Sequence, residues 1–226
     1  MSGETTIEEL RALRSRGGVI AFPTESSYGL GVDPHSAAGV AAIERIKRRI
    51  DRRIDWNRGS GDFDPERKPL PVVVADLSQL ADLGIDPDSE PVRRLAPFWP
   101  APLTGVLALA EGTDLPAALG RPTLAVRIPD HAELRELLAA IGPLTATSAN
   151  RTGEPPLLDA REVAELLEEA GAVDFAVVAG EAPGGPPSTL VAFDAADQIR
   201  ILRQGPFPAE RLEGLPASLS SSRGEA

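Results

Sequence analysis

The chain has 226 residues, of which 42% are hydrophobic and 25% are charged, a composition typical of a globular protein with a buried core. Its formal net charge of −11 argues against a broad nucleic-acid-binding surface, and the absence of cysteine excludes disulfides and Cys-ligated zinc. No apolar run is long enough to predict a membrane span and the N-terminus lacks a signal-peptide pattern, so we expect a soluble, cytoplasmic protein.

The first part of the chain predicts a helix, a strand and a second helix. Residues 5–18 predict a helix that begins with a capping box, formed by Thr6 and Glu9, and ends at two glycines. The apolar run at 18–22 predicts a buried strand, and residues 36–50 predict a helix with Ser36 as its N-cap. Residues 51–68 are polar and contain glycine, which favours a loop.

The remainder of the chain interleaves strands with helices. Strands are expected at 69–76, 104–112, 123–129, 143–150, 173–180, 188–194 and 198–205. Helices are expected at 77–84, 89–99, 130–142 and 159–171, the third of which starts with a box-like pair, Asp130 and Glu133. Because several strands follow each other without a helix, we predict an α/β (α+β-like) domain over residues 1–207, with helices packed on a twisted sheet of mixed parallel and antiparallel strands. Residues 208–226 are small and polar and are expected to form a flexible C-terminal tail.

Polar side chains gather where several predicted strands end. The strand at 18–22 runs into Thr24, Glu25 and two serines, and later strands end at Arg127, at residues 148–150 and at Arg203. Ligands of sheet proteins commonly bind in crevices at strand ends. Hydroxyl groups there suit a small polar ligand, and arginine suits phosphate or carboxylate. Each cluster alone is also explained by turn capping, but their recurrence favours one deep concave site.

Motifs of nucleophilic and metal chemistry are missing from the chain. It has no G-x-S-x-G elbow, no P-loop, no G-x-G-x-x-G after a strand and no H-E-x-x-H, so we predict neither a catalytic nucleophile nor a metal site. Residues 45–58 hold seven basic and two acidic side chains, which indicates either a local anion site or a solvated helix face. The Gly- and Pro-rich segment 180–189 either simply connects two strands or delivers Ser188 to the site.

Six segments, taken in chain order, resemble one family. They read FPTESSYGLG (22–31), FWPAPLTGVL (98–107), LAVRIPDH (124–131), TATSANRTGEPP (145–156), PPSTLVAFD (186–194) and ILRQG (201–205). Their order and spacing are similar to the YrdC/Sua5 domain of the threonylcarbamoyl-AMP synthase family, in its short single-domain form, over about residues 5–207. The resemblance implies that L-threonine, bicarbonate (or CO2) and ATP, with Mg2+, are condensed into threonylcarbamoyl-AMP and pyrophosphate. This is the first step in making the t6A base of tRNA, and the family's product passes to a tRNA threonylcarbamoyl transferase complex.

The resemblance also implies roles for individual residues. The positions that contact threonine match Thr24, Tyr28, Arg127, Ser148 and Ser188. Among them, Arg127 would pair with the carboxylate of the substrate. The positions that contact ATP match Lys47, Arg49, Lys68, Thr123, Asn150 and Arg203. Strong direct binding of nucleic acid is not expected, because only residues 45–58 are basic enough to face a phosphate backbone.

Two features depart from the family pattern. An insertion at 50–67 separates the basic triplet at 47–49 from the next proline-leucine strand, and Val73 stands where family members often carry histidine. They leave open a second interpretation, in which the chain is a YrdC-like paralogue that binds nucleotide or RNA without synthase activity.

Overall fold

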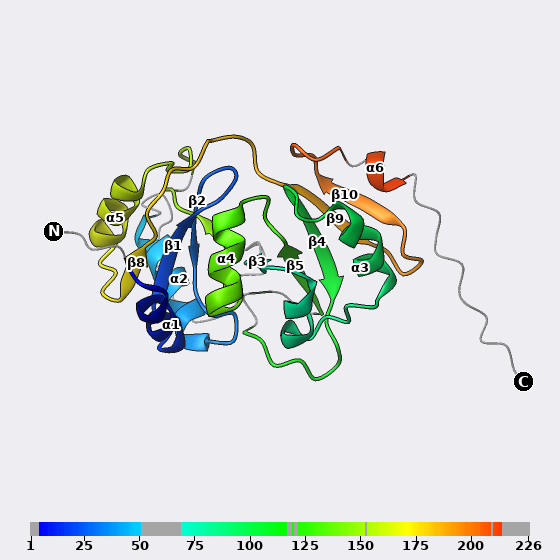
Figure 1. Ribbon diagram of the computed structural model, residues 1–226, viewed down its shortest axis with the longest axis horizontal. Coiled ribbons are helices and arrows are strands. Elements are labelled where there is room, and N and C mark those ends of the chain that lie inside the picture. The colour runs from blue at the N-terminus through cyan, green and yellow to red at the C-terminus, as the bar shows by residue number, and fades with distance from the viewer. Residues whose placement is uncertain are drawn as a thin grey trace, which may run out of the picture.

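Two mixed β-sheets form the framework of the chain (Figure 1). The structure is a computed structural model that describes residues 5–50, 69–116, 119, 122–151, 153–208 and 210–213. The first sheet has the order β7-β2-β1-β8, and these strands span Thr147–Ser148, Tyr28–Gly31, Val19–Pro23 and Phe175–Val177. The second sheet has the order β10-β9-β4-β5-β3-β6, and its strands span Ile199–Arg203, Thr189–Phe193, Leu103–Ala108, Thr123–Arg127, Val72–Val73 and Leu144–Thr145. In the first sheet β1 is antiparallel to β2 and parallel to β8, and in the second β4 is antiparallel to β5 and parallel to β9.

Helices pack beside both sheets and between them (Figure 1). Near the first sheet lie α1 (Ile7–Ser15), α2 (Ala37–Ile50) and α5 (Ala160–Glu169), and near the second lie α3 (Glu90–Leu95) and α6 (Glu210–Glu213). The helix α4 (Ala132–Ile141) occupies the centre of the view. Three short 3-10 helices, Leu77–Gln79, Ala81–Leu83 and Ala96–Phe98, complete the helical part of the described residues. Within those residues, none of the helices has the length and apolarity that a membrane span requires.

The strand β1 is apolar throughout because both of its faces are buried. Its side chains alternate between two faces, and both faces are covered. Ile20 and Phe22 pack into one buried cluster with apolar side chains of α1 and α4, whereas Val19 and Ala21 belong to a second cluster that includes side chains of α2 and α5. All five residues of β1 are buried. A central strand that is covered on both faces reads as a continuous hydrophobic run, and the prediction for residues 18–22 is therefore confirmed.

The two sheets are joined where β2 ends beside β6. The Thr145 amide donates to the Val32 carbonyl at 2.9 Å, and the Val32 amide donates to Thr145 Oγ1 at 3.0 Å. Gly31 lies at this junction, where a Cβ atom would be only 2.2 Å from the backbone oxygen of Thr145. Only glycine lets the two strands approach this closely. The described residues thus form two linked sheets, where the sequence predicted a single one.

Several local predictions are corrected by the structure. The start of α4 is capped by His131, whose Nδ1 accepts from the Leu134 amide at 3.2 Å, so the expected box of Asp130 and Glu133 is wrong. Residues 77–84 form two 3-10 turns that end at Gly84, where φ is +75°. The expected tail boundary after residue 207 cuts through packed structure, because Leu212 in α6 is fully buried. Residues 214–226 lie outside the described part of the chain.

Candidate active site

A cavity of about 250 Å3 lies between the two sheets. The first sheet contributes the β1–β2 loop with Glu25 and Ser26, and the second contributes Arg127 at the end of β5. The remaining lining comes from the β8–β9 connection, from Asp130 and from two prolines: Gly184, Gly185, Pro186, Ser188, Pro102 and Pro206. Pockets that hold drug-sized ligands enclose roughly 300–1,000 Å3, so this cavity suits a ligand as small as an amino acid.

An ion pair between Arg127 and Glu25 crosses the cavity and links the two sheets. Arg127 Nη1 donates to Glu25 Oε1 at 2.7 Å, and the two side chains are only 11% and 14% exposed. Burial lowers the pKa of the Arg127 guanidinium; the charge of Glu25 acts against this shift and the charge of Arg203 adds to it. Because an arginine keeps its proton at neutral pH, this wall of the cavity carries a fixed positive charge that can bind a carboxylate or phosphate.

Ser188 lies beside a second arginine. Arg203 donates to the Ser188 carbonyl through Nε at 3.0 Å and through Nη2 at 2.9 Å, and burial lowers the pKa of its guanidinium. The Ser188 hydroxyl is 2.7 Å from Thr104 Oγ1 on β4. The β8–β9 connection therefore delivers Ser188 to the site, as the sequence allowed, and brings it close to Arg203.

Lys47, Ser148 and Asn150 form a second polar cluster. Lys47 Nζ on α2 donates to the carbonyls of Ser148 and Asn150, both at 3.0 Å, and to Asn150 Oδ1 at 3.2 Å. The Ser148 hydroxyl donates to the same Asn150 Oδ1 at 2.6 Å. The fold thus brings Lys47 to Ser148 and Asn150, which lie about a hundred positions later in the chain, and the family resemblance assigns all three to the site.

Thr24 and Tyr28 are buried and hold the backbone around the cavity. The Thr24 hydroxyl donates to the Ser27 carbonyl at 2.8 Å and accepts from the amides of Ser26 and Ser27, which fixes the turn that carries Glu25. The Tyr28 hydroxyl lies 2.9 Å from the Val178 carbonyl and 2.8 Å from the Gly180 carbonyl, so it anchors the β8–β9 connection. The pKa of Tyr28 is raised to about 12, mainly by burial and to a smaller extent by the charges of Asp159 and Glu181.

Two further predicted residues, Arg49 and Thr123, lie away from these clusters. Arg49 Nη1 donates to the carbonyls of Ala170 and Gly171 at the end of α5, at 2.9 and 3.3 Å. Thr123 begins β5 and Arg127 ends it, so the two lie about 13 Å apart by the rise of a strand. Lys68 lies outside the described residues.

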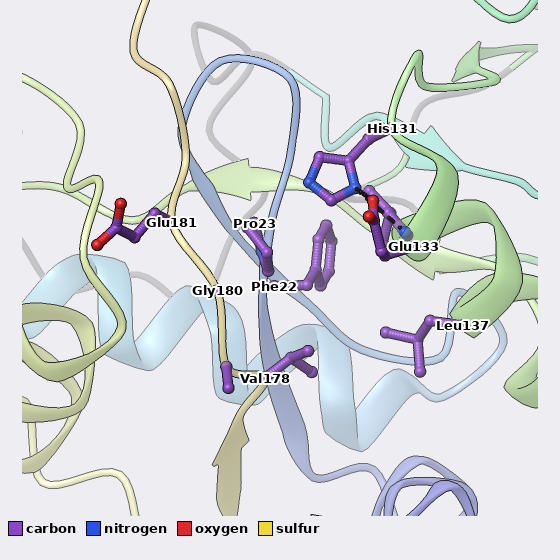
Figure 2. A pocket seen from close by; sticks show the side chains of 10 residues that line it. Phe22, Pro23, His131, Glu133, Leu137, Val178, Gly180 and Glu181 are labelled. Carbon is purple, nitrogen blue, oxygen red and sulfur yellow. Dashed lines mark hydrogen bonds and ion pairs between the residues drawn. The ribbon is translucent and has the colours of Figure 1, made fainter. Parts of the chain in front are cut away.

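A second cavity of about 250 Å3 borders the same loops (Figure 2). Phe22, Pro23, Leu137 and Val178 make its apolar lining, with His131 and Glu133 on one side and Glu181 on the other. Nδ1 of His131 caps α4, where it accepts from the Leu134 amide, and it lies 3.3 Å from Glu133 Oε2. This cavity contains none of the residues that the sequence assigns to the site, and we place the candidate active site in the cavity of Arg127.

Sequence reasoning gave Glu25 no specific role within its polar cluster and assigned Asp130 only to a helix cap, although both line the cavity. Glu25 stands in the polar run that follows β1, and this run is the sequence feature that could have indicated its place in the site. Its pairing with Arg127 joins residues that are 102 positions apart, which no local pattern reveals.

Comparisons with known proteins agree on the family. The family model Sua5_yciO_yrdC, described as "Telomere recombination", matches residues 12–54 and 64–205. The threonylcarbamoyl-AMP synthase of Chromohalobacter salexigens is 35% identical over 195 residues, which cover 85% of this chain and 95% of that protein. The structure of P. abyssi Sua5 complexed with L-threonine matches with a TM-score of 0.72 at 29% identity, covering 92% of this chain and 56% of that one. The structure of E. coli YciO matches with a TM-score of 0.70 at 24% identity, covers 91% of this chain and 92% of that one, and supports the fold alone. The family model passes over residues 55–63, inside the insertion expected at 50–67. On these matches the chain belongs to the Sua5/YciO/YrdC family.

Proposed function

We propose that this chain is a threonylcarbamoyl-AMP synthase, which condenses L-threonine, bicarbonate (or CO2) and ATP and releases pyrophosphate. The Chromohalobacter relative that carries this name is matched over 95% of its length. The observation that carries the proposal is the buried guanidinium of Arg127 in a cavity of about 250 Å3. Such a cavity provides one strong anion-binding group in a volume suited to a free amino acid.

Threonine binding is assigned to the Arg127 cavity. Arg127 binds the α-carboxylate, for which its planar guanidinium offers two parallel donors. Ser188 lines the same cavity and supplies a hydroxyl. Thr24 and Tyr28 act through the backbone, since their hydroxyls hold the β1–β2 loop and the β8–β9 connection in place. Ser148 acts from the neighbouring cluster with Lys47.

ATP binding is assigned to the basic and amide groups around this cavity. Lys47, Asn150 and Arg203 would meet the phosphates, and Thr123 would meet a more distant part of the nucleotide. The threonine amine first forms a carbamate, with bicarbonate and loss of water or with CO2 and loss of a proton. A carbamate oxygen then attacks the α-phosphorus, and the bond to pyrophosphate breaks. Such a transfer depends on positioning and on cations near the developing charge, and so it requires no protein nucleophile.

Mg2+ is proposed to enter together with ATP. Among the described residues, no three His, Cys, Asp or Glu side chains are grouped so that they could hold a metal ion. Mg2+ in nucleotide sites is commonly held by substrate phosphates with one or two carboxylates and water. The metal would neutralise phosphate charge.

The reaction places the chain at the first step of t6A formation in tRNA. We propose that it works in the cytoplasm and that its product passes to a tRNA threonylcarbamoyl transferase complex. The net charge of −11 favours transfer of the small product over tight binding of tRNA by this chain.

Pyrophosphate release from ATP tests the proposal. We expect release that requires both L-threonine and bicarbonate and that is weak with L-serine or L-valine. Arg127→Ala should raise the KM for threonine while ATP still binds, and Arg161→Ala is the control because that side chain is 87% exposed on α5. If the folded protein with Mg2+ releases no pyrophosphate, the synthase proposal fails, and a paralogue that only binds nucleotide or RNA becomes the better interpretation.

A further inference from the structure

Glu25 is the most buried carboxylate around the candidate threonine cavity. Its side chain is 14% exposed, whereas Asp130, the other carboxylate of this cavity, is 65% exposed and lies 4.0 Å from Arg135. The Thr24 hydroxyl fixes the turn on which Glu25 stands, through hydrogen bonds to residues 26 and 27. The carboxylate of Glu25 is therefore held at one place in the wall of the cavity.

Only one of the two oxygens of the Glu25 carboxylate has a hydrogen-bond partner within the described part of the protein. Oε1 accepts from Arg127 Nη1 at 2.7 Å, but Oε2 is buried and has no hydrogen-bond partner there. Arg127 is similarly incomplete, because Nη1 is its one donor with a hydrogen bond to a described residue. Buried polar groups are nearly always paired, and an exception calls for a physical reason. Arg–carboxylate pairs are frequently bidentate, so the single contact here leaves hydrogen-bonding capacity on both partners.

A free amino acid supplies the missing partners. Its carboxylate and its ammonium group are attached to the same carbon, and so they reach two neighbouring groups of opposite charge at once. The carboxylate fits the unused donors of Arg127, and the ammonium group is a donor for a carboxylate oxygen. The Arg127–Glu25 pair presents both charges side by side in one small cavity.

We infer that Glu25 binds the α-ammonium group of the amino-acid substrate and so selects α-amino acids over acids without an amine. This inference rests on the proposed function, which places threonine in the Arg127 cavity. Glu25 is the partner of Arg127, and on binding the substrate inserts its own two charges between them. The nitrogen that becomes the carbamate nitrogen is thereby held next to Glu25.

Binding measurements with two ligands test this role. The ligands are L-threonine and the analogue in which a hydroxyl group replaces the α-amino group, measured by calorimetry with the full chain. We expect the wild-type protein to bind threonine about tenfold or more tightly than the analogue, the effect of one charge-assisted hydrogen bond. Glu25→Gln should lose this preference while affinity for the analogue stays within about threefold. Asp130→Asn, which removes a carboxylate from the same cavity, should keep it.

Each outcome separates the inference from the proposed function. If wild-type protein binds neither ligand, the threonine site itself is wrongly placed. If wild-type protein prefers threonine and Glu25→Gln keeps that preference, the role of Glu25 is refuted while the synthase proposal stands. If Glu25→Gln is folded by circular dichroism but loses both ligands equally, Glu25 only positions Arg127 and the inference is again refuted. Should Glu25→Gln fail to fold, Glu25→Asp replaces it, and a shorter carboxylate must weaken threonine binding more than analogue binding.

Discussion

Gly205 follows β10 and packs directly against the backbone that carries Ser188. A Cβ atom at this position would lie 2.3 Å from the Pro187 carbonyl oxygen and 2.4 Å from the Thr189 amide nitrogen. Both contacts are with backbone atoms, which cannot rotate away as a side-chain end can. The Gly205 amide also donates to Thr189 Oγ1 at 2.9 Å, so the two segments are already hydrogen-bonded at this distance. Gly205→Ala must push them apart.

The expected cost follows from this overlap. Overpacking of a tight contact typically destabilises by roughly 1–3 kcal/mol, which lowers the Tm of a chain of this size by roughly 3–10 °C. The displacement also moves Ser188 and the Arg203 contacts to it, so threonine affinity should fall together with Tm. Thermal unfolding and threonine titration measure the two effects. In Gly112→Ala the added Cβ meets nothing within 4 Å, and although its φ of +80° carries some strain, that variant should keep threonine affinity. A Tm for Gly205→Ala within one degree of wild type, with unchanged binding, would refute the argument.

Two further predictions concern Tyr28 and Arg49. Tyr28 is the one tyrosine of the chain, so spectrophotometric titration should show phenolate formation near pH 12, because burial raises its pKa from the ordinary value of 10.0 to about 12. Since the pKa is raised in the folded state, the contribution of Tyr28 to folding stability is complete below about pH 10 and is lost as pH rises through about 12. A titration midpoint near pH 10 would show that the phenol is solvated. Arg49→Gln should lower stability by about 0.3–1 kcal/mol, because the guanidinium holds carbonyls at the end of α5, and should leave the KM for ATP within twofold. A tenfold rise in that KM would instead support the phosphate role expected from the sequence.

Local patterns in the sequence predicted the elements that depend on local interactions. The capping box of α1 is present, with the Glu9 amide donating to Thr6 Oγ1 at 3.2 Å and the Thr6 amide to Glu9 Oε2 at 2.8 Å. The same reasoning failed at α4, where Asp130 and Glu133 have the right spacing but the imidazole of His131 is one residue closer to the free amides. A spacing rule does not include such competition between neighbouring side chains.

Parts of the candidate site were predictable for a different reason. Arg127 stands out as a charged residue that ends an apolar strand, and in the structure it lines the cavity between the two sheets. Lys47 and Arg49 were expected to act together, but residues two apart point to different sides of a helix, and the structure uses them at two separate places. That separation could have been inferred from the helical period. The Glu25–Arg127 contact could not, because it depends on how two sheets meet.

The position of the cavity between two sheets has a consequence for the energetics of the whole chain. A molecule that touches Arg127 and the β1–β2 loop at once holds the sheets together, and it binds the folded chain only, because the unfolded chain has no such cavity. By mass action, a ligand present at 100 times its Kd adds about 2.7 kcal/mol to the free energy of unfolding. Bound threonine therefore stabilises the folded chain as well as serving as a reactant. The melting temperature of the protein therefore reports how full the site is, even under conditions in which no chemistry occurs.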